Sequence, residues 1–330
     1  DHLKIIYRIY QFTLIFVILD SFFQIFTGAD IFGLEPQDKE LRRISGPFGE
    51  KQILGSFLQK ILPIYIYLIY KLFEITKKLK ILDLSIITFS LVLIFRSGDR
   101  AALGLILLFS LILFLSSKQF RKEIFLIGII FIGISSILFF QNPNFQKRIF
   151  VDTIGQFKGK HYEHFLKKDE NETNFNFMIF SFVHQTHYTT SYRMFKNKPI
   201  FGHGVKMFRY SCKNFQFESK RQYIDDYGNL TSKYYGCSTH PHNTYMQLLA
   251  ETGIFGFIAL SVLFFYLFVK ILSFNRNNKN LLPSNILLIA IFINLWPLIP
   301  TGNFFNNWIS MIYFVPISYY LFEINSKLKK

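Results

Sequence analysis

Long blocks of apolar residues constrain this chain more than any other feature. Apolar residues make up 51% of the sequence, and 42 of the 330 residues are Phe. They gather in blocks divided by short polar stretches, without the spacing of an amphipathic surface helix. Because a hydrocarbon core of about 30 Å needs roughly 20 apolar residues in a helix, such blocks are typical of membrane spans. The sequence predicts an all-α protein, a polytopic transmembrane helix bundle.

Eight segments approach or exceed the length of a span: residues 3–26, 53–73, 82–95, 101–116, 124–140, 243–272, 284–300 and 305–323. The third and fourth could form one long helix, but Arg96, Asp99 and Arg100 would then lie in mid-membrane. Each such charge costs about 2.5 to 3.5 kcal/mol. We therefore expect a turn at Ser97-Gly98. Three parts follow: five spans in residues 1–140, an extracytoplasmic loop over 141–242, and three spans with a cytoplasmic tail in 243–330.

Basic residues in the short loops predict the orientation. They follow the second, fourth and sixth spans and recur in the tail: Lys71, Lys77, Lys78, Lys80, Lys118, Arg121, Lys122, Arg276, Lys279, Lys327, Lys329 and Lys330. The positive-inside rule puts them in the cytoplasm and the long loop on the opposite side of the membrane. These anchors account for much of the net charge of +16, and no nucleic-acid-binding module is recognisable.

The long loop is expected to carry the chemistry. Seven of the eight histidines lie in it or at its end, and so do Cys212 and Cys237. In an oxidising compartment these cysteines could form a disulfide, with two free thiols as the alternative. His184 and His187, like His240 and His242, have spacings seen in zinc sites, but no acidic or Cys set completes one, so we predict no metal. We expect the loop to be partly helical, with a helical hairpin within residues 175–200 as a lid.

The most informative stretch begins at His240-Pro241-His242-Asn243-Thr244 and continues through Glu251, Gly253 and Gly256. It resembles the O-antigen ligase/polymerase family, whose hallmark is a His-Asn pair opening a helix that carries Glu, Gly and Gly at this spacing. Ser97-Gly98-Asp99-Arg100-Ala101-Ala102-Leu103 is similar to the family's short Arg-bearing turn. Arg193, ahead of Pro199-Ile200-Phe201-Gly202-His203-Gly204, is similar to its second Arg and Gly-x-Gly turn.

Two external loops match some family members as well: residues 43–49 and 300–305. The resemblance therefore covers most of the chain from residue 42 to 323. Members usually have more spans than eight, which favours the absence of N-terminal helices here. Arg100 is preferred to Arg96 as the counterpart of the first family Arg, because Arg100 directly precedes the helix.

The resemblance implies an inverting glycosyltransferase that needs no metal or other cofactor. It would move a glycan from an undecaprenyl-diphosphate donor, among membrane lipids, to a hydroxyl of a saccharide or lipid-linked acceptor. A His can accept that proton near neutral pH, so His242 is the candidate base. Arg100 and Arg193 would bind the diphosphate. Further substrate contacts are expected from His240, Asn243, Gly202, Gly204 and Arg96.

Two questions stay open at the level of sequence. A ligase and a polymerase would share the donor and differ only in the acceptor. A non-catalytic transporter or flippase of lipid-linked sugars is the alternative class of function. It would be expected to show ionisable residues or Pro/Gly breaks at the centre of several spans. Here the charged residues gather at one predicted face, which favours the enzyme.

Overall fold

The computed structural model describes residues 2–36, 43–73, 81–157, 182–214, 216–224, 230–274 and 282–328. The chain divides into two compact units. The first, here the membrane unit, comprises Asp1–Ile149, Leu267–Asn294 and Ile312–Lys330; the second, here the loop unit, comprises Phe150–Tyr266 and Leu295–Met311. Several predicted features lie outside the described residues: the anchors Lys77, Lys78, Lys80, Arg276, Lys279, Lys329 and Lys330, and residues 175–181 of the expected lid.

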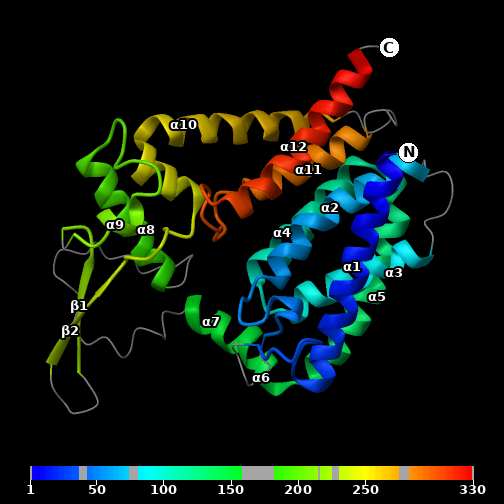
Figure 1. The fold of residues 1–330 in the computed structure, drawn as a ribbon, viewed down its shortest axis with the longest axis horizontal. Helices are drawn as coiled ribbons and strands as arrows, with labels where there is room; N and C mark the ends of the chain where they lie inside the picture. Colours follow the sequence, from blue (N-terminus) through cyan, green and yellow to red (C-terminus); the bar gives the residue numbers. More distant parts are fainter. Residues whose placement is uncertain are drawn as a thin grey trace. The chain divides into compact units, whose positions relative to one another are not determined.

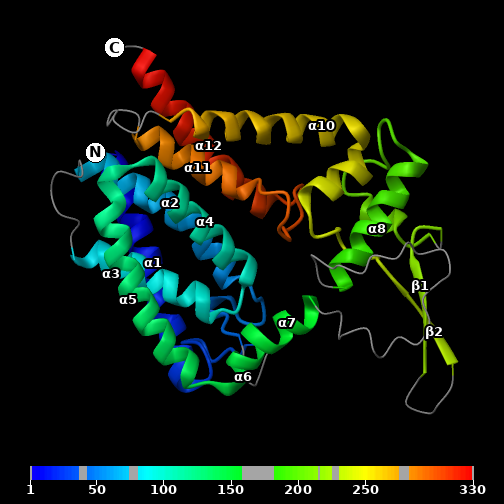
Figure 2. The same ribbon diagram turned by 180° about the vertical axis from the view of Figure 1, so that it is seen from behind.

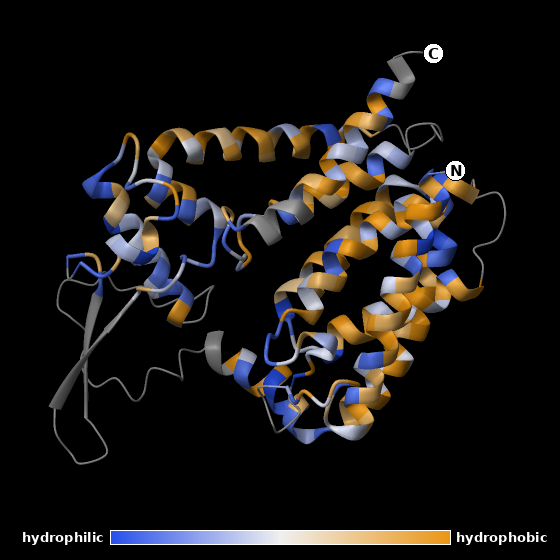
Figure 3. Cartoon of the chain, in the orientation of Figure 1, coloured by the Kyte–Doolittle hydropathy of each residue, from blue (hydrophilic) through white to orange (hydrophobic). Residues whose placement is uncertain are grey.

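Long helices make up the membrane unit, as Figures 1 and 2 show from opposite sides. They are α1 (His2–Thr27), α2 (Leu54–Phe73), α3 (Ile81–Arg96), α4 (Arg100–Ser116), α5 (Arg121–Phe140), α11 (Leu282–Asn294) and most of α12 (Asn307–Leu328), followed after α5 by the short α6 (Pro143–Gln146). Most of their residues are hydrophobic, as the orange stretches of Figure 3 show. The all-α membrane fold predicted from the sequence is confirmed.

Among the residues that the structure describes, three helices are long and apolar enough to cross a membrane: α1, residues Lys118–Phe140, and α10 (Thr244–Leu272). Arg100–Ser116 and Pro283–Asn294 are shorter apolar helices. Apart from the segment 284–300, the helices that correspond to the predicted segments begin and end within five residues of them. The number of spans itself stays a prediction.

The turn between α3 and α4 forms where the sequence predicted it. Gly98 adopts a φ of 66°, which a residue without a Cβ reaches at little cost. Asp99 caps α4, since its carboxylate accepts a hydrogen bond of 3.1 Å from the Ala102 amide. Arg100 is thereby fixed as the first residue of α4, with an exposed side chain.

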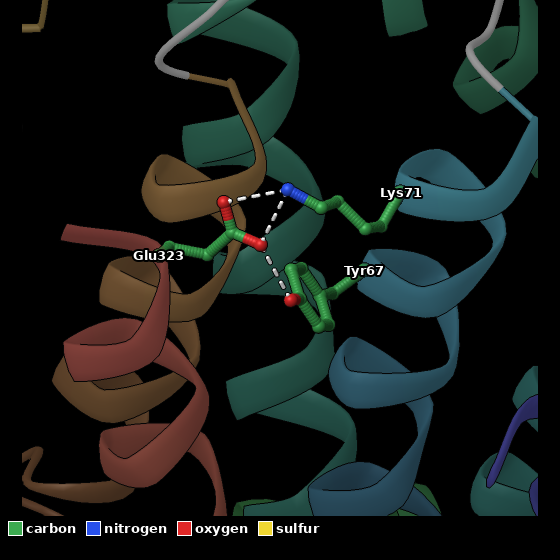
Figure 4. Close-up of polar contacts among 3 residues, drawn as sticks. All are labelled: Tyr67, Lys71 and Glu323. Atoms are coloured by element: carbon green, nitrogen blue, oxygen red, sulfur yellow. Dashed lines mark hydrogen bonds and ion pairs between the residues drawn. The ribbon is translucent and has the colours of Figure 1, made fainter. Parts of the chain in front are cut away.

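Buried acids tie the helices of the membrane unit together. Glu323 of α12 forms an ion pair with Lys71 of α2, 2.8 Å, and accepts a hydrogen bond of 2.7 Å from the Tyr67 hydroxyl (Figure 4). Asp83 of α3, fully buried, accepts from the hydroxyls of Tyr7 and Tyr65. A buried carboxylate that lost these donors would be left with its full desolvation cost, so the contacts fix how α1, α2, α3 and α12 pack.

The loop unit contains α7 (Asp152–Phe157), α8 (Phe182–Asn197), α9 (Phe208–Ser211) and the first part of α10. An antiparallel hairpin, which the sequence analysis did not predict, pairs β1 (Ser219–Ile224) with β2 (Leu230–Tyr235), Ser219 opposite Tyr235. Cys212 and Cys237 form a disulfide, with Cα atoms 5.1 Å apart. Around it lies a small core: Met194, Phe208, Cys212, Phe217 and Ala250.

Two predicted elements differ from the structure. Within the described part of residues 175–200 there is a single helix, α8, and no helical hairpin. The segment expected to be helical over 284–300 ends at Asn294. Pro297 cannot continue a helix and disfavours the helical conformation of the residue before it. The carbonyls of Leu295 and Pro297 instead accept hydrogen bonds from the side chains of Tyr245 and Asn243.

Candidate functional site

His242 lies two residues before the start of α10, in an unusual backbone conformation. Its φ is +56°, a region in which non-glycine residues are uncommon and Asn, Asp and His are enriched among them. Its carbonyl oxygen accepts a hydrogen bond of 2.8 Å from the amide of Thr301. Such a backbone is strained and persists only where its surroundings hold it.

Asn243 supplies much of that support. Its side-chain oxygen accepts from the amide of Met246, 3.1 Å, in the manner of a helix N-cap. Its side-chain amide donates to the carbonyl of Pro297, 2.8 Å. The side chain is buried and bonds to backbone on both sides. The predicted substrate-binding residue Asn243 therefore acts here as a clamp that positions its neighbour His242.

Residues 295–306 pass beside the start of α10 and are bonded to it repeatedly. The Tyr245 hydroxyl donates to the Leu295 carbonyl, 2.7 Å, and the hydroxyls of Thr244 and Thr301 lie 2.9 Å apart. Further along, Gln247 donates to the Asn303 side chain, 2.8 Å. The segment that resembles an external loop of the family thus forms one wall of the histidine site.

Three other imidazoles surround His242. Its ring centroid lies 4.1 Å from that of His240, 5.4 Å from His187 and 5.6 Å from His184. His184 and His187 share one face of α8, because residues three apart in a helix are neighbours on its surface. These four residues, His184, His187, His240 and His242, are here named the histidine cluster.

The environment of the cluster lowers the pKa of three of its rings, those of His187, His240 and His242. Burial, followed by the repulsion of the nearby His187, lowers the pKa of His242 below its usual 6.5. Burial, followed by repulsion from His242, lowers the pKa of His240 to about 4. Burial also lowers the pKa of His187. At neutral pH the ring of His242 is therefore unprotonated, the state a general base needs.

Gly202 and Gly204 lie in a turn that docks against a break in α10. At Gly253 the backbone leaves the helical conformation, with a φ of 68°. The freed carbonyls of Ala250 and Glu251 accept hydrogen bonds from the amides of His203 and Gly204, 3.0 and 2.8 Å, and the Ile254 amide donates to Pro199, 2.8 Å. The Gly-x-Gly turn therefore completes the hydrogen bonding of α10.

This docking requires glycine at both Gly202 and Gly253. A Cβ at Gly202 would overlap the Glu251 backbone, and one at Gly253 would overlap the carbonyl of Ile200. The Glu251 side chain accepts from the Phe208 amide, 2.9 Å, and from Gln247, 3.0 Å. Glu251 therefore braces α10, and neither of these two hydrogen bonds involves His242.

Arg193 points towards backbone carbonyls of its own unit. Its guanidinium donates to the Glu218 carbonyl, 2.8 Å, and to that of Phe217, 3.4 Å. It lies six residues beyond His187 on α8, about 240° further round the helix. Arg193 thus belongs to the same unit as His242 but projects from a different face of α8 than the histidines.

Arg100 and Arg96, the two candidates for the first family Arg, lie in the membrane unit. Arg100 is exposed, whereas Arg96 is buried with its guanidinium 4.9 Å from the Phe145 ring centroid. Two arginines that the sequence analysis did not single out as ligands hold the turn. Arg43 donates to the Ser97 carbonyl, 3.2 Å, and Arg148 to that of Gly98, 3.3 Å. Arginines from three segments thus converge on one turn.

Sequence reasoning missed His184 and His187 as partners of His242. It considered them only as metal ligands because their spacing on a helix was visible, whereas their contact with His242 depends on the tertiary fold. Among the described residues, no group of three or more His, Cys, Asp or Glu side chains is arranged to hold a metal ion.

Comparison with known proteins supplies the family. A search of curated proteins found no match. A sequence model of the family described as O-antigen ligase matches residues 84–261, which is more than half of the chain. The matched range includes the turn from Ser97 to Arg100, α8, the Gly-x-Gly turn and the histidine cluster. The chain therefore belongs to the O-antigen ligase family, and it is a membrane protein.

Proposed function

We propose that this protein is an inverting glycosyltransferase that moves a glycan from an undecaprenyl-diphosphate donor to an acceptor hydroxyl. The observation that carries the proposal is a neutral, half-buried imidazole, His242, held in a strained backbone conformation at the mouth of α10. Strain of this kind gathers at functional sites. Membership of the O-antigen ligase family supports the same class of reaction.

In the proposed reaction His242 takes the proton of the acceptor hydroxyl. The acceptor oxygen forms a bond to the anomeric carbon from the face opposite the diphosphate. The bond from that carbon to the diphosphate oxygen breaks, and the diphosphate leaves with the electron pair. One displacement of this kind inverts the anomeric centre. A base so placed is typically worth about 10² to 10⁴ in rate.

Arginines are proposed to stabilise the charge that grows on the leaving diphosphate. Guanidinium groups stay protonated and offer paired donors to phosphate oxygens. Arg100 is exposed at the start of α4, which suits direct contact. Arg193 is proposed for a second contact, since a guanidinium has five N–H donors and can bind backbone and phosphate together. We propose the outer face of a bacterial inner membrane for the reaction.

The proposal is tested with His242→Asn. Asn tolerates positive φ, so this change removes the imidazole while keeping the backbone compatible with the αL region. With purified full-length protein, a lipid-diphosphate glycan and acceptor sugars, we expect transfer to fall by at least about 10²-fold. Donor binding, measured separately, should be largely kept.

The matched control is His2→Asn, because His2 is exposed on the first turn of α1. It should transfer glycan like the unaltered protein. Transfer at the unaltered rate by His242→Asn would refute the general-base role.

A further inference from the structure

Arg209 is a charged side chain of the loop unit to which the proposed reaction gives no task. It lies in α9 and is half-buried, and its guanidinium Nε is buried without a hydrogen-bond partner. Within the part of the chain that the structure describes, no carboxylate forms an ion pair with it. A buried charge without a partner costs free energy, which a bound anion would recover. Arg209 therefore has the properties of a ligand-binding residue.

The disulfide holds Arg209 beside the histidine cluster. Cys212, the residue after α9, continues its helical turn, so Arg209 and Cys212, three residues apart, share one face. Cys212 is bonded to Cys237, which lies three residues before His240. The Ser238 hydroxyl donates to the His240 carbonyl and closes a tight turn there. Arg209 and His240 are therefore each held within three residues of the same covalent link.

Arg209 gives this end of the cluster a positive charge. Burial, followed by repulsion from His242, lowers the pKa of His240 to about 4, and repulsion from Arg209 contributes to the shift. The imidazole of His240 is therefore unprotonated at neutral pH, whereas a guanidinium stays charged. An anion that approached His240 would meet this guanidinium.

The proposed reaction determines which substrate the charge faces. The ring centroids of His240 and His242 lie 4.1 Å apart, so Arg209 is on the side of the proposed base. In an inverting displacement the base and the acceptor hydroxyl lie on one face of the anomeric carbon, and the leaving diphosphate lies on the other. We infer that Arg209 binds an anionic group, a carboxylate or a phosphate, of the acceptor saccharide. The inference rests on the proposed function and names the class of acceptor, an anionic sugar.

The test compares three sugars that share one ring and differ only at C6: glucose, glucuronate and glucose 6-phosphate. Their affinities are measured by calorimetry with the purified full-length protein in detergent. We expect the unaltered protein to bind at least one of the anionic sugars at least about tenfold more tightly than glucose, because a hydrogen bond to a charged group contributes this much. The tighter of the two shows whether the site takes a carboxylate or a phosphate.

Two variants of Arg209 separate loss of charge from loss of fold. In Arg209→Gln the preference should fall below about threefold, because the side chain stays polar but is no longer charged. Arg209→Lys keeps the charge without the paired donors, so its preference should stay above about threefold. The affinity of Arg209→Gln for the lipid-diphosphate glycan should equal that of the unaltered protein, since the inference puts the diphosphate on the opposite face of the sugar.

The matched control is Lys196→Gln. Lys196 is exposed on α8, nine residues beyond His187 and therefore on the opposite face of the helix. The change removes one positive charge from the same unit, away from the histidines. It should keep the full preference for the anionic sugar.

Three results would overturn the inference. The first is equal binding of the three sugars by the unaltered protein, or no binding of any of them. The second is a preference that persists in Arg209→Gln. The third is a loss of donor affinity in Arg209→Gln, because the guanidinium would then serve the diphosphate. Failure of the proposed function would show separately, as the absence of glycan transfer by the unaltered protein.

Discussion

His242 combines a strained backbone with a protected ring. A positive φ at a non-glycine residue costs on the order of 1 to 3 kcal/mol, and here it is held by the Thr301 amide and the clamp of Asn243. A different backbone conformation would turn the imidazole away from His187 and His240. We therefore interpret the strain as the means by which the chain keeps this ring in place.

The pH–rate profile should have an acidic limb that reports the protonation of the His242 imidazole. Burial and His187 lower the pKa of His242, so the base is lost only when pH falls below 6.5. We expect kcat/KM to be flat near neutral pH and to fall on the acid side of 6.5. His187→Gln removes one of the groups that lower this pKa, so the limb should move towards higher pH. The measurement is transfer rate against pH for both proteins.

His184 and His240 also face His242 and stay in place in this variant. Burial, the larger cause of the lowered pKa of His242, also remains, so the limb should stay below its position for an exposed histidine. An unchanged limb in His187→Gln would show that His187 does not act on the base.

At the scale of elements, the main feature of α10 is the break in its helical backbone at Gly253. Nothing local to residues 244–272 predicts a break, because the helix is apolar and its glycines would be tolerated in a membrane span. The break forms because the Pro199–Gly204 turn supplies hydrogen-bond partners to the backbone that it frees. The two glycine-containing motifs, far apart in the sequence, are therefore the two sides of one contact.

Gly253→Ala should disrupt this contact. The added methyl group would overlap the Ile200 carbonyl, and Ala disfavours the observed φ of 68°. We expect a loss of more than about 2 kcal/mol of stability. The measurement is thermal unfolding in detergent.

Gly104→Ala in α4 is the control, because its Cβ would meet nothing within 4 Å. It should be neutral or stabilising, since Ala is the better helix former. Equal melting temperatures for the two variants would contradict the docking of the Gly-x-Gly turn.

Sequence reasoning succeeded where the physics is local. Apolar blocks and charges determine helices and turns within a few residues, so the fold class and the turn at Gly98 could be predicted. The end of α11, the β-hairpin and the contacts of His184 and His187 with His242 depend on partners distant in the chain. Arg193 shows the same limit: its motif was visible, but its bonds to the Phe217 and Glu218 carbonyls were not.

At the scale of the whole molecule, the side of the membrane on which each part of the chain lies determines whether the proposed chemistry can occur. The disulfide between Cys212 and Cys237 requires an oxidising compartment. The basic residues Lys118, Arg121 and Lys122, at the start of the fifth helix, favour the cytoplasm by the positive-inside rule. One end of α5 and the loop unit should therefore lie on opposite sides of the membrane.

Single cysteines can test this directly, because the chain has two cysteines and both are in the disulfide. Lys198 and Lys118 are exposed. In intact cells a membrane-impermeant maleimide should label Lys198→Cys, whereas Lys118→Cys should be labelled only after lysis. The unaltered protein should stay unlabelled in both conditions. Labelling of Lys118→Cys alone in intact cells would put the histidine cluster in the cytoplasm, where a disulfide is not maintained and the proposed donor site could not face outwards.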